Sequence, residues 1–197
     1  LCGLDYALLR REFLGLEVKR RACPPRRLLI SLGGGDHLDA TSSALHALRA
    51  DPALATLETR VLVGASNPRW RKYEGLARGT SATLMAHQSD VASQMLWADV
   101  AVTGSGSILW ECLHLALPTV AVVIADNQAP LAATLEARGL LLAVDHRERP
   151  NARGVAVALR QLTAEPEPRA TVHREGPQVV DGAGAARVAR ALRERVT

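Results

Sequence analysis

Three short segments of small and polar residues carry the groups best suited to bind an anionic ligand. They are Gly33-Gly34-Gly35-Asp36, Gly104-Ser105-Gly106-Ser107 and Asp126-Asn127-Gln128. Each segment follows an apolar run typical of a strand, and in an open parallel sheet ligands bind outside the carboxyl ends of the strands. The sequence therefore predicts one binding edge to which all three segments contribute.

The segment from Gly104 to Ser107 lies between the apolar run VAVT and the helical pattern ILWECLHLA. Glycine at positions 104 and 106 leaves room for a phosphate near the backbone, where free N–H groups and a helix N-terminus attract negative charge. Glu111 lies four residues after Ser107, so its carboxylate can face the same edge and accept both hydroxyls of a ribose. The alternative is a tight strand-to-helix turn in which Glu111 only interacts with the helix dipole.

The glycine triplet follows LLISL and permits positive φ angles or a close approach of a ligand to the backbone. The alternative is a flexible turn in which Asp36 caps a helix. We expect capping for Asp36, because its carboxylate would repel a diphosphate. The amides of Asn127 and Gln128 can donate to and accept from sugar hydroxyls, whereas the simpler alternative is helix capping by Asp126 or Asn127.

Histidines and cysteines form no recognisable metal or nucleophile pattern. The histidines at positions 37, 46, 87, 114, 146 and 173 lack the spacing of metal ligands, and the cysteines at 2, 23 and 112 are odd in number and far apart. No serine has a matching His and Asp in a nucleophile elbow, and His114 is expected to pack rather than to catalyse. We expect no cofactor and no metal.

Short apolar runs alternate with segments of helical period, which predicts an α/β fold: a Rossmann-like parallel sheet of about six strands with helices on both faces. The expected strands are residues 27–32, 60–63, 83–85, 100–103, 119–124 and 141–144. The expected helices are 38–50, 68–78, 90–98, 107–116, 128–138, 153–163 and 183–195, with a connector at 164–167. We expect caps at Asp90 and Ser107, a left-handed Gly139, and a last helix that packs across the sheet.

The chain has 197 residues, 48% hydrophobic content and a formal net charge of +4, which suits one domain with a substantial core and an anionic ligand. An aromatic content of 3% leaves few stacking platforms for nucleic acid. No apolar run reaches the length of a membrane span, and residues 1–11 lack the order of a secretory signal. We therefore expect a soluble cytoplasmic protein.

Six segments together carry a resemblance to a known family. They are YALLRREF at 6–13, LISLGGGD at 29–36, ASNP at 65–68, ADVAVTGSGSILWE at 98–111, LPTVAVVIADNQ at 117–128 and VVDGAGAARV at 179–188. These segments resemble the C-terminal domain of GT-B nucleotide-sugar enzymes. The similarity is greatest to the UDP-sugar hydrolase of pseudaminic acid synthesis and to spore-coat polysaccharide biosynthesis proteins, and it extends more loosely to the GlcNAc transferase of peptidoglycan synthesis.

This resemblance implies a UDP site between two Rossmann-like domains. It implies that the diphosphate lies near Gly104 to Ser107, the ribose on Glu111, and the sugar near Gln128 and the Gly34 to Gly35 loop. The uracil would lie near Gln88, with Ser66 and Asn67 close by. Residues 1–26 would be an interdomain linker remnant and residues 27–197 the nucleotide-sugar-binding domain. The partners implied are UDP or a UDP-sugar and the N-terminal domain of the same protein.

We interpret the chain as the UDP-sugar-binding domain of a hydrolase that acts on a UDP-2,4-diacetamido-2,4,6-trideoxyhexose, without its catalytic N-terminal half. Trp110 departs from some of these hydrolases, which carry asparagine beside the glutamate, so both the sugar and the reaction stay open. One alternative is the C-terminal domain of a UDP-sugar-dependent glycosyltransferase. Another is an NAD-binding module, since GSGSIL resembles G-x-G-x-x-G, although Leu109 stands where the third glycine belongs. A non-catalytic scaffold is the third.

Overall fold

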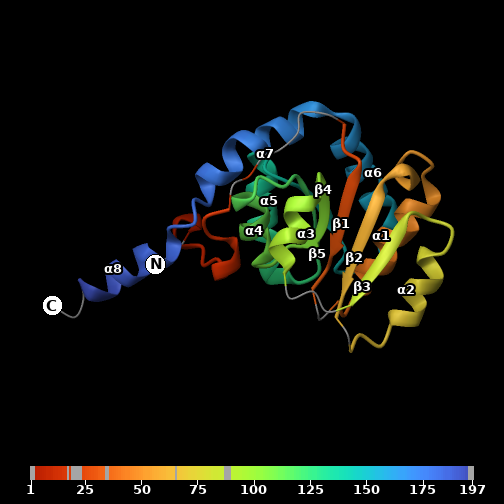
Figure 1. Cartoon of the computed structure of the whole chain (residues 1–197), viewed down its shortest axis with the longest axis horizontal. Helices are drawn as coiled ribbons and strands as arrows, with labels where there is room; N and C mark the ends of the chain where they lie inside the picture. The colour runs from red at the N-terminus through yellow and green to blue at the C-terminus, as the bar shows by residue number, and fades with distance from the viewer. Residues whose placement is uncertain are drawn as a thin grey trace.

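The computed structural model of the chain contains one six-stranded parallel sheet with helices packed on both faces (Figure 1). It describes residues 3–16, 18, 24–33, 36–64, 66–86 and 90–194. The strand order is β3-β2-β1-β4-β5-β6. The strands are β1 (Arg27–Ser31), β2 (Glu58–Val63), β3 (Ala82–Ala86), β4 (Val100–Gly104), β5 (Thr119–Val123) and β6 (Leu142–Asp145). The predicted fold class and strands are confirmed.

The helices alternate with the strands along most of the chain, as the sequence pattern predicts. They are α1 (Ala40–Ala50), α2 (Trp70–Ala77), α3 (Val91–Trp97), α4 (Ile108–His114), α5 (Ala129–Ala137), α6 (Ala152–Ala164), α7 (Pro166–Val179) and α8 (Gly184–Arg193). Short 3-10 helices are η1 (Leu4–Tyr6), η2 (Arg11–Phe13), η3 (Leu54–Thr56) and η4 (Asp126–Gln128).

The core consists of apolar layers on the two faces of the sheet. Successive side chains of β1 point to opposite faces, so Leu28 and Ile30 pack with α1, α2 and α6, whereas Leu29 packs with α3 and α4. Phe13 from η2 is fully buried in this second layer. Described residues before β1, such as Phe13, therefore pack against the body of the domain, and the origin of this segment as a linker stays a prediction.

The order of the strands creates a switch point between β1 and β4. From β1 the chain builds outward through β2 and β3, then returns to add β4 on the other side of β1. The register pairs Ser31 of β1 with Thr103 of β4, and Gly104 of β4 with Val122 of β5. The loops that follow these strands therefore leave the sheet side by side, at the edge where such folds bind ligands.

Two of the predicted helix ends are confirmed in full and one only in position. The side chain of Asp90 accepts a hydrogen bond from the backbone N–H of Ser93, and Gly139 has a φ of 69°. Ser107 occupies the N-cap position of α4, but its side chain makes no capping hydrogen bond. The first turn of α4 is thus not capped by its own serine.

The helix α7 was not predicted, because its sequence carries residues that usually interrupt helices. Pro166 and Pro168 lie in the first turn, where a missing N–H is tolerated, and Pro177 lies near the end. The Arg169 guanidinium donates to three carbonyl groups at the end of α6, those of Leu162, Thr163 and Glu165. These bonds tie α7 directly to the end of α6, and no separate linker segment lies between the two helices.

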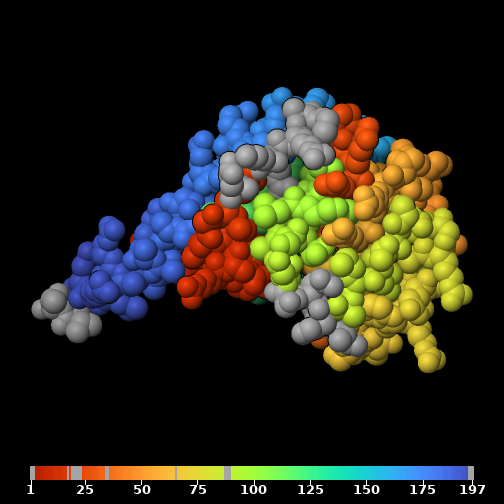
Figure 2. Space-filling view, viewed as in Figure 1, coloured from red at the N-terminus to blue at the C-terminus, as the bar shows by residue number. Residues whose placement is uncertain are grey.

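The predicted placement of the last helix is wrong. Rather than crossing the sheet, α8 contacts η1 and projects from the body of the domain beside the N-terminal residues (Figures 1 and 2). Leu192 on this helix is 59% exposed. The amphipathic pattern of α8 indicated an apolar partner but not which one. Among the described residues, no helix is both long and apolar enough to span a membrane.

Gly184 permits the close contact between α8 and the N-terminal residues. A Cβ atom at this position would lie 2.1 Å from the carbonyl oxygen of Ala7. We therefore predict that Gly184→Ala lowers the free energy of unfolding by about 1–3 kcal/mol, the usual effect of overpacking, as measured by urea denaturation.

Gly75→Ala provides the matched control, because a Cβ atom at Gly75 would meet nothing within 4 Å among the described residues outside its own helical turn. Its expected effect is a small gain, up to about 1 kcal/mol, from the higher helix propensity of alanine. Equal stability changes in the two variants would contradict the packing role of Gly184.

Candidate functional site

The structure brings the predicted turns together at the carboxyl edge of the sheet. Gly33 follows β1, Ser105 to Ser107 follow β4, and Asn127 and Gln128 follow β5, so these turns leave three adjacent strands. Ser66 and Asn67 follow β2, on the other side of β1. Three further predicted site residues lie outside the described residues, namely Gly34, Gly35 and Gln88.

Ser105 stands at the centre of this edge with a hydroxyl that has no partner. The residue is 1% exposed, and its Oγ atom has no hydrogen-bond partner among the described residues. Its backbone N–H donates to the carbonyl oxygen of Val122 at 3.1 Å, which ties the turn to β5. A buried polar group without a partner costs about 1–3 kcal/mol, so this hydroxyl is a candidate for a hydrogen bond to a group that the described residues do not supply, such as a ligand or a water molecule.

The glycines on either side of Ser105 are not required by the turn itself. Gly104 and Gly106 do not have positive φ angles. A Cβ atom at Gly104 would lie 3.8 Å from the carbonyl oxygen of Leu32, an ordinary contact, and one at Gly106 would meet nothing within 4 Å among the described residues. Neither the backbone conformation nor packing among the described residues therefore requires glycine at position 106. The absence of a side chain at Gly106 leaves the space outside the turn open.

Gly33 differs from these two glycines. Its φ of 82° lies in the left-handed region, which disfavours any other residue. The positive φ angle that would explain glycine in the triplet is therefore observed at Gly33.

Glu111 lies in the first turn of α4 and is 8% exposed. Both of its carboxylate oxygens accept hydrogen bonds from Arg10: Nε lies 2.8 Å from Oε1, and Nη2 lies 3.1 Å from Oε2. In the sequence, Arg10 belongs to the segment YALLRREF, and no pattern there predicts a partner for it. Its contact with Glu111 spans 101 residues, and no local pattern indicates such a pair.

Gln128 is held in one orientation by the main chain. Its Oε1 atom accepts a hydrogen bond of 3.0 Å from the backbone N–H of Ile124, so its amide Nε2 is oriented away from this bond as a donor. The capping alternative is not supported, because Gln128 rather than Asp126 or Asn127 occupies the N-cap of α5 and makes no side-chain capping bond. Asn127 is exposed at the same edge.

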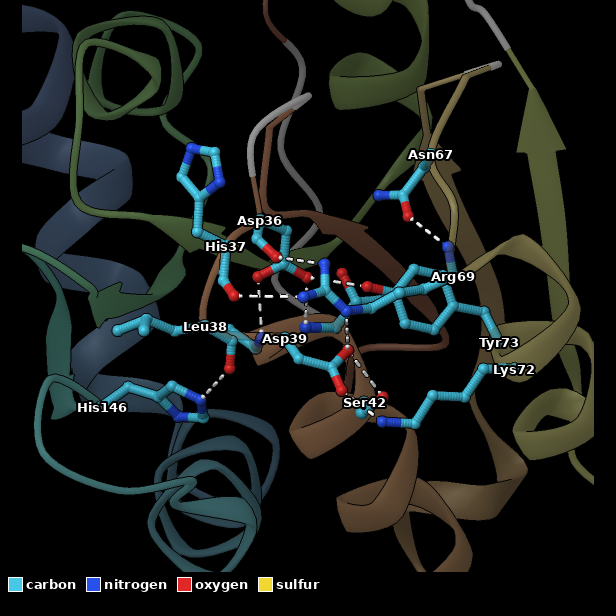
Figure 3. Close-up of polar contacts among 12 residues, drawn as sticks. Asp36, His37, Leu38, Asp39, Ser42, Asn67, Arg69, Lys72, Tyr73 and His146 are labelled. Carbon is cyan, nitrogen blue, oxygen red and sulfur yellow. Dashed lines mark hydrogen bonds and ion pairs between the residues drawn. The ribbon is translucent and has the colours of Figure 1, made fainter.

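Asp36 caps α1, as expected. Its carboxylate accepts hydrogen bonds from the backbone N–H groups of Ala40 and Thr41 and from the hydroxyl of Tyr73 (Figure 3). Burial raises the pKa of the Tyr73 phenol, and the negative charge of Asp36 raises it further. The N-cap position itself is Asp39, which lies in the left-handed region with a φ of 58°.

The loop from Asp36 to Asp39 is braced from both sides (Figure 3). Arg69, just before α2, donates to the carbonyl groups of Asp36 and His37 at 3.1 and 3.3 Å. His146, after β6, lies with Nε2 3.1 Å from the carbonyl oxygen of Leu38, while its Nδ1 accepts from the backbone of Asn151. The loop beside the switch point is thus fixed by residues that the sequence analysis did not assign to the site.

Lys72 and Ser42 stabilise the unusual backbone of Asp39 through its side chain. Both donate hydrogen bonds to the Asp39 carboxylate. Burial opposes ionisation of this carboxyl group, but the hydrogen bonds from Lys72 and Ser42 outweigh it and lower its pKa.

The turn after β2 contains the residues expected near the uracil. Ser66 is exposed, and the side-chain oxygen of Asn67 accepts a hydrogen bond of 2.9 Å from the backbone N–H of Arg69. The turns after β2 and β4 flank β1, which separates them by roughly 10 Å, two strand spacings. In the part of the chain that the structure describes, no group of three or more potential metal ligands gathers.

Comparisons with known proteins agree with this architecture. No protein-family model matches the chain. The spore coat polysaccharide biosynthesis protein SpsG of Bacillus subtilis is 22% identical over 98% of this chain and 57% of its own length. The chain spans about half the length of this relative and of the solved structures that it resembles.

Two such structures are glycosyltransferases. The glycotransferase of kitacinnamycin matches 97% of this chain and 48% of its own, with a TM-score of 0.68 and 16% identity. The spinosyn rhamnosyltransferase SpnG, solved with thymidine diphosphate, matches 88% of this chain and 46% of its own, with a TM-score of 0.64 and 15% identity. At these identities the likeness establishes the fold alone, and that fold matches the Rossmann-like half of the GT-B architecture.

A charged cluster braces the edge next to Asn127. Arg147, after β6, donates to the carboxylates of Asp145 and Asp126. The hydrogen bonds from Arg147 lower the pKa of Asp145 to about 2. Because this folded-state pKa is depressed, the stabilisation is complete above an ordinary carboxyl pKa near 4 and is lost as the pH falls towards 2.

We predict that Arg147→Ala raises the pKa of Asp145 from about 2 towards the ordinary aspartate value of about 3.9 without reaching it, because the backbone N–H of residue 147 still donates to the carboxylate. Carbon-detected NMR titration of the side-chain carboxyl group measures this change directly. A titration midpoint that stays near 2 in the variant would contradict the assigned cause.

Proposed function

We propose that this chain is the nucleotide-sugar-binding half of a GT-B glycosyltransferase that uses a UDP-activated sugar. The observation that carries the proposal is the buried Ser105 hydroxyl without a partner, at the switch point of a sheet with the Rossmann strand order. A phosphate oxygen of the nucleotide would accept from this hydroxyl and from the backbone N–H groups of the turn.

The remaining contacts follow from the same edge. Gly104 and Gly106 let the diphosphate approach the main chain, and Glu111, one helical turn further along, accepts from the ribose. The Gln128 amide donates to the sugar from the neighbouring strand end, with Asn127 beside it. Gly34 and Gly35, which lie outside the described residues, are proposed to contact the same sugar. The uracil faces the turn that contains Ser66 and Asn67, and Gln88, which lies outside the described residues, is the third residue proposed to contact it.

The charge of the chain suits this ligand. A departing UDP develops negative charge, which oriented N–H groups stabilise without a metal ion. The partners are a UDP-sugar and a second domain that completes the active site. Since the chain spans 57% of SpsG, we expect the 197 residues to bind UDP but not to turn over a UDP-sugar without that domain.

A glycosyltransferase accounts for the comparisons better than the hydrolase that the sequence analysis preferred. Most of the structures that resemble this chain are glycosyltransferases, although one carries the name of a UDP-N-acetylglucosamine 2-epimerase, and none of their names points to hydrolysis of a diacetamido sugar nucleotide. A hydrolase and a glycosyltransferase would use the same nucleotide site. A measurement of UDP binding therefore tests the part of the proposed function that the two activities share.

The NAD-binding alternative loses support from the fold. In dinucleotide-binding domains the glycine-rich turn follows the first strand, whereas the Ser-Gly turn follows β4. Leu109, in the position of the third glycine, is 1% exposed and packs in the apolar layer under α4.

We predict that the chain binds UDP and that Gly106→Ala lowers the affinity by roughly tenfold or more, since 1.4 kcal/mol corresponds to a factor of ten. The added methyl group enters the space that the diphosphate needs, yet contacts nothing in the described residues. The free energy of unfolding should therefore stay within about 0.5 kcal/mol of the wild type. Isothermal titration calorimetry and urea denaturation measure the two quantities.

Uridine, inorganic phosphate and NADH serve as ligand controls, and Gly75→Ala serves as the protein control. Selective binding of UDP over phosphate, lost in Gly106→Ala and kept in Gly75→Ala, supports the proposal. An equal response to any anion, or tighter binding of NADH than of UDP, would overturn it.

A further inference from the structure

Arg10 and Glu111 form a two-point ion pair that joins the residues before β1 to the proposed ribose site. The guanidinium presents Nε and Nη2 to the two oxygens of one carboxylate, at 2.8 and 3.1 Å. This parallel arrangement fixes the plane of the carboxylate as well as its distance. The hydrogen bond to Glu111 also raises the pKa of the Arg10 guanidinium.

The two partners differ in exposure. The side chain of Glu111 is 11% exposed, whereas that of Arg10 is 49% exposed. A carboxylate as buried as Glu111 is unfavourable without a counter-ion, and Arg10 supplies one while remaining open to solvent. Arg10 therefore orients the Glu111 carboxylate at the position where the ribose is proposed to bind.

Arg10 is itself held in place by the turn on which it lies. Its guanidinium carbon lies 4.9 Å from the centre of the Phe13 ring, and its Nη1 lies 3.0 Å from the carboxylate of Glu12. Phe13 is fully buried, and its carbonyl oxygen lies 3.1 Å from Nε2 of His114 on α4. The 3-10 turn that follows Arg10 is thus anchored to α4, the helix that carries Glu111. The Arg10–Glu111 ion pair therefore joins two segments that other contacts already hold together.

An ionised carboxylate can accept about four hydrogen bonds, and Arg10 uses two of these positions. We propose that Arg10 is a positioning residue: it orients Glu111 so that the remaining lone pairs accept the ribose hydroxyls. This inference rests on the proposed function. It makes residues before β1 part of the nucleotide site, and it predicts that the pair sets the preference for ribose over deoxyribose.

The test compares UDP with 2′-deoxy-UDP by calorimetry, because the ratio of the two affinities reports on the ribose contact alone. We expect the wild type to prefer UDP by about tenfold, a typical factor for a hydrogen bond to a charged group. Arg10→Ala should bring this ratio close to one. Arg10→Lys keeps the positive charge but not the two-point geometry, so it should give an intermediate ratio of the two affinities. If Arg10→Ala does not fold, Arg10→Lys replaces it in the test.

Arg11→Ala is the matched control, since Arg11 lies on the same 3-10 turn and is exposed. It should keep the wild-type ratio. In a Glu111→Ala background, Arg10→Ala should change the ratio no further, because the two residues act as one unit.

The outcomes separate the two proposals. If the wild type does not bind UDP, the proposed function fails and this inference fails with it. If UDP binds and Arg10→Ala lowers the free energy of unfolding but leaves the ratio of UDP to 2′-deoxy-UDP unchanged, the ion pair only stabilises the fold and this inference alone is overturned.

Discussion

The pairing of β1 with β4 is the constraint on which the rest of the structure depends. It places a strand reached early in the chain beside one reached some 70 residues later, with Leu28 opposite Val100 and Ser31 opposite Thr103. The glycine loop and the Ser-Gly turn therefore leave the sheet as neighbours, although neither turn determines the other's position. The buried hydroxyl of Ser105 and the open space at Gly106 lie at this junction. A ligand with several acceptor oxygens suits both features.

A second constraint is a set of hydrogen bonds that orient the polar groups around the junction of β1 and β4. Arg69 and His146 fix the loop after β1 from opposite sides, Arg147 joins the ends of β5 and β6, and Arg10 holds Glu111. Each of these residues follows or precedes a regular element rather than lying in the core. These hydrogen bonds hold several of the polar groups at this edge in defined orientations, and groups oriented in this way lose less conformational entropy when a ligand binds.

The sequence predicted the sheet well because local patterns decide it: TVAVVI lacks polar alternation and forms a strand buried on both faces, and Asp90 and Gly139 mark helix ends. It did not predict α7, whose prolines are tolerated only at particular positions, or the contact of α8 with η1, which depends on Gly184 and Ala7. Within the site, it identified the turns but not Arg10, Arg69 or His146. Their partners lie 101, 33 and 108 residues away, and a single sequence carries no signal for such pairs.

The most direct measurement of the central claim is a crystal structure of this chain with UDP. The account predicts a phosphate oxygen within about 3 Å of the Ser105 Oγ atom, the distance of an ordinary hydrogen bond, with the main chain of Gly106 against the diphosphate and the ribose hydroxyls on Glu111. A structure in which UDP binds at another edge, or in which Ser105 keeps its hydroxyl away from every phosphate oxygen, would contradict it.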